Sequence, residues 1–493
     1  METLLSNLKL GEIGEGTENI KIYKRSFTHY QGTFLLMIKE SANKFLLASG
    51  EGPLYRELNG QEIGDEGKVC PLTHHNRLVL NRYFDYTVPS AFGKNTATIG
   101  LGDRLGIASP GHIEAIKNRD VKPILGQQSI RELTLTKRTM EDMIDTATFA
   151  VFQEGYKDGF GIDADHIKKE EDIKRSLELG VTMLTLDCSD YIQKDVESAS
   201  KKQVQDEFAK LDVKLKKYYL NTYSNQVFSL KTRKIAVNEI DVMRNVLIYG
   251  KAVAYMIHVF NTYVRHLDRD FDFEISIDET EAITSPEAHF FVANELRKSQ
   301  VEVTSLAPRF CGEFQKGIDY IGDIDQFEKE LSEHVDIAKH FGYKLSIHSG
   351  SDKFSVFPII SKHTERILHI KTAGTSWLEA LRVIANKNPS LYRKIHAYAE
   401  KNVEQALKYY HITPNFEAIT PLEDTKDSML SEYLNDDNAR QLLHITYGLI
   451  LTANRNESCL FKDEIYSMLS ENEDVYREYL IKHIGKHVET LGL

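Results

Sequence analysis

"GFGIDADHIK", residues 159–168, is a short apolar run that ends in Asp163, Asp165 and His166. A run of this length after glycine is typical of a buried β-strand. A strand does not need two carboxylates and an imidazole at its tip in order to fold. Burying a polar group without a partner costs roughly 2–7 kcal/mol, and more for a charge. We therefore interpret this stretch as a strand that delivers reactive side chains to one end of a sheet.

Similar apolar runs recur from about residue 97 onward, and amphipathic helical stretches such as "SPEAHFFVANELRKSQ" (285–300) follow most of them. The other runs are residues 96–103, 121–127, 181–187, 273–279, 301–309, 343–350 and 366–374. Parallel strands need helical crossovers, and near-continuous apolar strands are buried on both faces. Eight such units predict an α/β fold, a TIM-like (β/α)8 barrel. The alternative is a doubly wound sheet, but no G-x-G-x-x-G spacing follows the first run.

The sequence flanking these runs predicts three consecutive segments. Residues 1–90 mix short alternating runs with turn signals and are expected to form an N-terminal β-rich or α+β segment. Residues 91–390 are expected to form the catalytic barrel, with a helical insertion at 190–270. Residues 391–493 are expected to form a helical extension.

Composition excludes several classes of protein. The net charge of −12 disfavours a nucleic-acid-binding surface, which would be basic. The four cysteines form no CxxC pair, which argues against a zinc ribbon or a disulfide scaffold and favours a reducing compartment. We see no signal peptide and no apolar run long enough to cross a membrane. A cytoplasmic protein is expected, and a homo-oligomer is compatible with the sequence.

Polar residues gather where the runs end, and in a barrel that end carries the chemistry. In chain order they are Asp103 and Arg104; Gln127 and Gln128; Asp163, Asp165 and His166; Asp187 and Asp190; Asp278, Glu279 and Glu281; Arg309; His348, Ser349, Asp352 and Lys353; and His369, Lys371 and Thr372. Such groups must pair with each other, with a metal or with a ligand.

Three histidines from different strands predict a metal site. His166, His348 and His369 lie beside the carboxylates of Asp165 and Glu279, and imidazole with carboxylate suits a borderline divalent ion. One divalent cation is expected, with Zn, Mn, Ni and Co not distinguished. The alternative for each histidine is a hydrogen-bonded core or rim residue.

Two loops predict a site for an anion. "SGSDK" (349–353) and "TAGTS" (372–376) follow the last two strands, where barrels often bind anions through backbone N–H groups. Lys353, Lys371 and Arg309 could add positive charge. Asp103 and Gln127, at the ends of the first two strands, are further candidates for substrate contact. The alternative is that the small residues only make tight turns and that Asp103 forms a rim salt bridge with Arg104.

Several of these stretches resemble one family. "GLGDRLGIASPGHI", "DADHIK", "TSPEAHFFVANEL", "SLAPRFCGEFQKGIDYIGD", "LSIHSGSDKFSVFPI" and "HIKTAGTSWLEALR" are similar to the tagaturonate epimerases of hexuronate catabolism, a family related to tagatose 4-epimerases. The resemblance covers the chain from about residue 20 to the C-terminal helices. It implies an isomerase that interconverts D-tagaturonate and D-fructuronate with a divalent metal. Asp165 and Glu279 would be the acid/base pair, unless Glu279 is a ligand, and His166, His348 and His369 would be the metal ligands.

The chemistry of these sugar acids favours retro-aldol cleavage, because they differ at a carbon β to the ketone whose C–H proton is not acidic. The alternatives are an epimerase or isomerase of neutral ketohexoses, such as a tagatose/fructose 4-epimerase, and a non-catalytic sugar-acid-binding protein. A doubled acid/base set disfavours a binding protein, which needs only an anion clamp.

Overall fold

A closed barrel of eight parallel strands organises the protein, as predicted. The computed structural model describes residues 1–65, 67–278, 283–455 and 458–493. The strands are arranged in the order β12-β13-β14-β15-β6-β7-β8-β9. Their bounds are β6 Thr98–Leu101, β7 Lys122–Ser129, β8 Gly161–Ile167, β9 Met183–Asp187, β12 Asp272–Ser276, β13 Ser305–Ala307, β14 Lys344–Ile347 and β15 Leu368–Thr372. Each of the eight apolar runs supplies one strand, which confirms the α/β barrel.

The chain divides into two compact units, and each combines segments that are far apart in sequence. The first unit holds residues 1–90, 101–162 and 373–486, and the second holds residues 91–100, 163–372 and 487–493. The sequence predicts three consecutive segments, 1–90, 91–390 and 391–493. This division remains a prediction.

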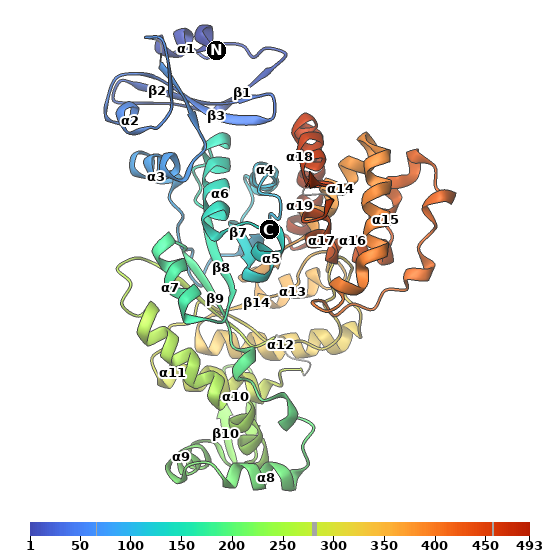
Figure 1. Ribbon diagram of the computed structural model, residues 1–493. Helices are drawn as coiled ribbons and strands as arrows, with labels where there is room; N and C mark the ends of the chain where they lie inside the picture. Colours follow the sequence, from blue (N-terminus) through green and yellow to red (C-terminus); the bar gives the residue numbers. More distant parts are fainter. Residues whose placement is uncertain (66, 279–282, 456–457) are drawn as a thin grey trace. The chain divides into compact units, whose positions relative to one another are not determined.

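An antiparallel sheet begins the first unit, as expected from the alternating runs (Figure 1). Its order is β1-β2-β3-β5-β4, with bounds β1 Ile20–Tyr30, β2 Thr33–Glu40, β3 Asn43–Gly50, β4 Gln61–Ile63 and β5 Gly67–Pro71. Side chains of β2 alternate between two apolar clusters. Leu35 and Met37 pack with Phe149 and Phe152 of α6 (Met140–Glu154), whereas Leu36 packs with α1 (Glu2–Lys9). The sheet is therefore covered on both faces.

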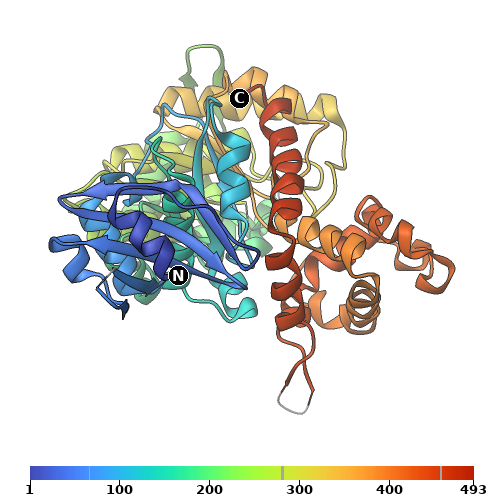
Figure 2. The same ribbon diagram turned by 90° about the horizontal axis from the view of Figure 1, so that it is seen from above.

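Helices of the C-terminal region share one core within the first unit. They are α14 Thr375–Lys387, α15 Pro389–Ala406, α16 Asp437–Ile445, α17 Tyr447–Leu451, α18 Lys462–Glu471 and α19 Glu473–Thr490. Figure 2 shows them from above, in orange to red. Trp377, with 1% of its surface exposed, packs in this core with Tyr392 and Tyr447. The helical character expected for this region is confirmed.

Residues 190–270, for which a helical insertion is predicted, lie in the second unit and contain three α-helices. The helices are α8 Lys201–Ala209, α9 Val213–Tyr223 and α10 Glu239–Val259 (Figure 1). A two-stranded hairpin, β10 Gln226–Ser229 with β11 Lys234–Val237, also lies here and was not predicted.

The remaining elements are mostly short or connect barrel strands. The helices are α2 Pro53–Glu57, α3 His74–Tyr83, α4 Ser109–Ile116, α5 Ile130–Thr136, α7 Glu170–Leu179, α11 Pro286–Lys298, α12 Ile324–Phe341 and α13 Phe357–Thr364. The 3-10 helices are η1 Asp85–Thr87, η2 Ser189–Tyr191, η3 Lys194–Val196, η5 Phe416–Ala418, η6 Leu422–Asp424 and η7 Asp427–Leu434, and η4 Phe260–Val264 is a π-helix. The short strands β16 Asn454–Arg455 and β17 Ser458–Cys459 pair with each other. Among the described residues, no helix is long and apolar enough to cross a bilayer.

Candidate active site

A buried ammonium group lies at the centre of the candidate site, which falls within the second unit. Lys371 of β15 donates from Nζ to Asp163 at 3.1 Å, to Asp165 at 2.7 Å and to Thr185 at 2.5 Å. Its Nζ also lies 2.9 Å from Glu274 Oε1. Barrel interiors are usually filled by branched apolar side chains, so an ionic layer at this depth departs from ordinary packing.

The charges in this layer stabilise each other. Burial alone would lower the pKa of Lys371, but Asp163, Asp165 and Glu274 outweigh it and raise that pKa well above its usual range. Burial would raise the pKa of Glu274, yet Lys371 and His348 hold it well below the usual range. Glu274 and Lys371 are therefore charged, and each remains buried because the other neutralises it.

A bulge in β8 brings two neighbouring side chains to the same place. Strand alternation would send Asp165 and His166 to opposite faces. The pairing of β8 with β9 shifts register between Ala164 and Ile167, and His166 adopts a left-handed φ of 53°. Bulges of this kind re-aim side chains beside functional sites. His166 Nδ1 consequently lies 2.7 Å from Asp165 Oδ1.

His348, which follows β14, stands between two carboxylates. Its Nε2 lies 2.8 Å from Glu274 Oε1, and its Nδ1 lies 2.9 Å from Asp278 Oδ1. Burial would lower the pKa of His348, but Asp278 outweighs it, with Glu274 adding a hydrogen bond, and the pKa rises to about 10. Burial would likewise raise the pKa of Asp278, but His348 and His166 lower it to about 2.

His166, Asp278 and His348 form a set that fits a divalent cation. One ligand atom from each lies within 4.8 Å of the others, and the two imidazole rings are 4.9 Å apart between centroids. Two imidazoles and a carboxylate are ordinary ligands for Zn, Mn, Ni or Co. Asp165 and Glu274 hold the other nitrogen of each histidine, as the carboxylate partners of metal-binding histidines do. His166 then offers Nε2 to a cation, and His348 offers Nδ1.

The third predicted histidine lies elsewhere in the barrel. His369 is on the same strand as Lys371 and two residues before it, so it faces inward one layer deeper. Its Nδ1 lies 2.8 Å from Thr98 Oγ1. Burial lowers its pKa to about 3, against the opposing effect of Glu274. The structure thus brings His166 and His348 together with Asp278 and does not bring His369 to that set.

The other predicted residues have varied surroundings. Lys353 is fully buried, and its Nζ donates to the carbonyls of Gln315, Ile318 and Ser351 at 2.9, 2.5 and 2.8 Å, which fixes a loop. Arg309 pairs with Glu313 at 3.5 Å. These two positions do not join the cluster around Lys371.

Asp103 and Gln127 belong to the first unit. Asp103 accepts from the backbone N–H groups of Gly106 and Ala108, both at 2.7 Å, at the start of α4. For Asp103, the alternative to substrate contact was a rim salt bridge with Arg104, but Arg104 instead forms a buried pair with Glu132 at 2.7 Å. Gln127 is buried in β7. Glu279 lies outside the described residues.

Sequence reasoning missed Glu274 and Thr185 and did not assign Asp278 to the metal. A signal was present, because Glu274, Ser276 and Asp278 alternate along "FEISID" (273–278) and so face inward together. It also missed Lys316, whose Nζ donates to Ser349 Oγ at 2.9 Å beside His348.

A closed barrel with a buried acid, imidazole and ammonium cluster at its carboxyl end defines the class of α/β-barrel enzymes. Residues 23–491 match the family model described as tagaturonate epimerase. The chain belongs to that family and is a carbohydrate epimerase.

Relatives match along nearly the whole chain. The tagaturonate/fructuronate epimerase of Thermotoga maritima is 39% identical over 484 residues, covering 97% of this chain and 98% of the relative. The native crystal structure of the fructuronate-tagaturonate epimerase UxaE from Cohnella laeviribosi has a TM-score of 0.95 at 52% identity, covering 96% of this chain and 97% of that one. A glycerol complex of the same Cohnella enzyme has a TM-score of 0.96 at 50% identity, covering 100% of this chain and 99% of that one.

Proposed function

We propose that this protein is a cation-dependent epimerase that interconverts D-tagaturonate and D-fructuronate by retro-aldol cleavage. The substrate pair is supported by the family match over residues 23–491 and by the names of relatives at 39% and 52% identity. The cation dependence is supported by one observation above all: His166, Asp278 and His348 converge, and each histidine has its own carboxylate partner.

The reaction must invert a carbon that lies β to the ketone. Its C–H proton is not acidic, so simple deprotonation would not epimerise it. In the retro-aldol route, a base removes the proton of the hydroxyl on that carbon while the bond to the α carbon breaks. A three-carbon aldehyde acid and an enediolate result. The aldehyde then rotates, the C–C bond re-forms on its other face, and an acid returns the proton.

A bound divalent cation would supply Lewis-acid chemistry, polarising the ketone and the neighbouring hydroxyl and stabilising negative charge. The chain's own residues prepare that position. Asp165 and Glu274 orient His166 and His348, and Lys371 keeps both carboxylates ionised at fixed places. Such preorganised charge is most effective in a buried site.

Asp165 and Glu279 are proposed as the acid/base pair. The surroundings of Asp165 add a second role. Burial would raise its pKa, but His166 and Lys371 hold it well below the usual range, so it is a weak proton acceptor. Asp165 could therefore serve to orient His166 instead of transferring a proton. For the carboxylate of the sugar acid, we propose Lys316, which lies beside the loop after β14.

Isotope labelling tests the mechanism. Epimerisation in deuterium oxide should leave the inverted carbon with its original hydrogen, as read by NMR, and chelation should stop turnover until a divalent metal is returned. Deuterium at that carbon would instead indicate proton transfer through an enediol. Faster turnover of tagatose than of tagaturonate would assign the protein to neutral ketohexoses, and binding without turnover would make it a sugar-acid-binding protein.

A further inference from the structure

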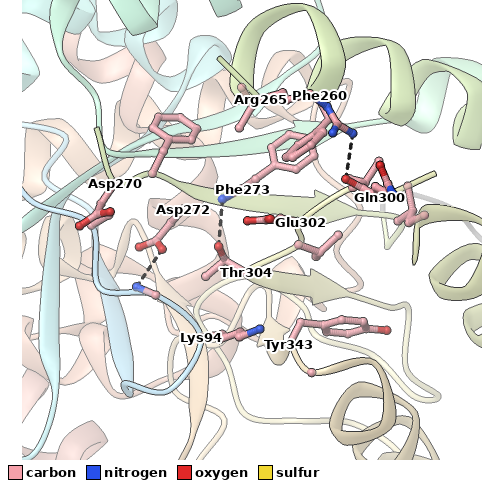
Figure 3. Close-up of a pocket in the computed structure, with 18 of the residues that line it drawn as sticks. Lys94, Phe260, Arg265, Asp270, Asp272, Phe273, Gln300, Glu302, Thr304 and Tyr343 are labelled. Carbon is pink, nitrogen blue, oxygen red and sulfur yellow. Dashed lines mark hydrogen bonds between the residues drawn. The ribbon is translucent and has the colours of Figure 1, made fainter. Parts of the chain in front are cut away.

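A cavity lies at the opposite end of the barrel from the ionic cluster. It has a volume of about 900 Å³ and is lined by residues that precede β6, by the amino ends of β12 and β14, and by the segment before β13 (Figure 3). Lys94, Asp272, Thr304 and Tyr343 mark these four places. Cavities of roughly 300–1,000 Å³ are the size that small-molecule sites use. The whole cavity belongs to the second unit.

The floor of this cavity is rigid. Asp272 accepts from the N–H groups of Phe92 and Gly93, both at 2.9 Å, which fixes the loop that carries Lys94. Lys344 holds the same loop through the carbonyl of Gly93 at 2.9 Å. The cavity is therefore formed before any ligand arrives.

Aromatic rings provide apolar walls. They come from Phe260, Phe271, Phe273, Phe341 and Tyr343. The hydroxyl of Tyr343 is hydrogen bonded to His289 Nε2 at 2.6 Å, which pins the ring. Arginine cations lie over three other rings: Arg265 is 5.1 Å from the Phe260 centroid, Arg269 5.4 Å from that of Phe271 and Arg297 4.7 Å from that of Phe341. Rings held in this way suit the C–H face of a carbohydrate.

Four basic side chains line the cavity. Lys94, Arg265, Arg269 and Arg297 all line it, and among the described residues no carboxylate forms an ion pair with any of them. Arg265 and Arg269 donate instead to the carbonyls of Gln300 and Val181, at 2.9 and 2.6 Å. The described part of the chain provides no hydrogen-bond partner for the ammonium of Lys94, which Figure 3 shows beside Tyr343.

Besides Asp272, two further carboxylates restrict what the cavity can bind. Asp270 and Glu302 line it and form no ion pair within the described ranges of the chain. They would repel a bare anion such as phosphate, but they accept hydrogen bonds from hydroxyl groups. A ligand therefore needs one negative charge for Lys94, hydroxyls for the two acids and an apolar face for the rings.

From these contacts we propose that the cavity is a second binding site for a small organic anion that carries hydroxyl groups, the class to which sugar acids belong. The site is separate from the proposed catalytic centre, because its walls come from the amino ends of strands whose carboxyl ends lead to Asp278 and His348. The inference does not depend on the proposed function.

Calorimetry on metal-depleted full-length protein tests the proposal with D-glucuronate as the probe. Glucuronate should bind, whereas neutral D-glucose and inorganic phosphate should bind at least about 5-fold more weakly, the effect expected for losing one exposed charge contact. Lys94→Gln should weaken glucuronate binding by a similar factor, and Lys94→Glu should weaken it further. Lys174→Gln, which changes another exposed lysine, in α7, is the control and should leave the affinity unchanged.

Two further readouts separate this site from the catalytic one. Lys94→Gln should keep the epimerase kcat and KM of the wild type, and crystals soaked with glucuronate should show it against Tyr343. Equal affinity in the wild type and both Lys94 variants would overturn the proposal, as would density for glucuronate only beside His166 and His348. Equal binding of phosphate and glucuronate would also reject it, because the hydroxyls and the rings would then contribute nothing.

Discussion

At the scale of single residues, Lys371 decides the charge balance of the candidate site. Its ammonium contacts Asp163, Asp165 and Glu274 in the buried interior. Lys371→Met should leave these carboxylates without their shared cation and destabilise the metal-free protein by about 3–5 kcal/mol, the cost of breaking a buried pair. Urea unfolding measures this. A divalent metal should reduce the loss, because it returns positive charge nearby.

Lys371→Arg is the control for that prediction, since it keeps the charge while changing the geometry. If Lys371→Met and the wild type have equal free energies of unfolding in the presence of a chelator, the ammonium of Lys371 does not stabilise the cluster.

The ligand set makes a paired prediction for two histidines. His348→Gln removes a nitrogen that faces Asp278 and should lower the bound divalent metal to below about one tenth of wild type, in line with losing one of a few ligands. His369→Gln changes a histidine that contacts Thr98 instead and should keep its metal. Metal content by mass spectrometry compares them. Loss of metal in both variants would restore the set predicted from sequence, which contains His348 and His369 together.

Asp165 has two roles that one variant can separate. If Asp165 transfers protons, Asp165→Asn should lower kcat at least about 100-fold while metal affinity stays at the wild-type value. If it orients His166 through the 2.7 Å contact, metal affinity should fall about 10- to 100-fold and saturating metal should restore much of the rate. Chelator competition and steady-state kinetics distinguish them. A variant normal in both would remove Asp165 from the site.

At the scale of elements, a partly buried acid, Glu473, helps to join the start of α19 to the N-terminal sheet of the first unit. Glu473 pairs with Lys44 at 2.7 Å and Lys39 at 3.3 Å, and it accepts from the Tyr23 hydroxyl at 2.8 Å. Burial would raise its pKa, but Lys44 and Lys21 lower it to about 2. Glu473→Gln leaves these cations without a carboxylate and should cost about 3 kcal/mol at pH 7.

The sign of the pH effect follows from that lowered pKa. Stability from Glu473 is fully present above its unfolded pKa near 4.5 and is lost as the pH falls toward 2. The difference between wild type and Glu473→Gln in thermal unfolding should therefore shrink as the pH falls through this window. Glu478→Gln, on the same helix, serves as the control. A pH-independent difference would contradict a charged Glu473.

The strands could be predicted because burial on both faces leaves a continuous apolar run between turn residues. The runs were longer than the strands, as in 301–309 against Ser305–Ala307, since apolar loop residues extend the pattern. The β10–β11 hairpin was missed because its strands, Gln226–Ser229 and Lys234–Val237, are short and mostly exposed, so that no continuous apolar run marks them. Strands this short give too few alternations to be recognised.

The site was only partly predictable for a related reason. Alternation along a strand shows which residues share a face, as His369 and Lys371 do. Alternation does not show how deep in the barrel each side chain lies. The depth matters here, because His369 is hydrogen bonded to Thr98 whereas Lys371 is bonded to Asp165. The bulge that turns His166 inward depends on pairing with β9, which a single strand's sequence does not contain.

For the whole molecule, buried neutral histidines govern stability in mild acid. His112 of the first unit and His334 of the second are both fully buried, and burial is the main cause that lowers each pKa to about 4. In the unfolded chain both titrate near 6.5. Between pH 6.5 and about 4 the unfolded state therefore binds more protons, and stability falls as the pH falls.

Each such histidine should contribute a slope approaching 1.4 kcal/mol per pH unit, the limit for about one proton. The free energy of unfolding, measured in urea from pH 5.2 to 6.5 with chelator present, should fall steadily toward acid, before most carboxylates titrate. His112→Asn can keep a hydrogen bond to Ser376 but loses the titrating ring. The slope of its unfolding free energy with pH should therefore be shallower by up to the contribution of one proton. His411→Asn, at an exposed position, should leave the slope unchanged. A slope in His112→Asn as steep as in wild type would mean that His112 is already protonated in the folded protein, and that burial does not control its charge.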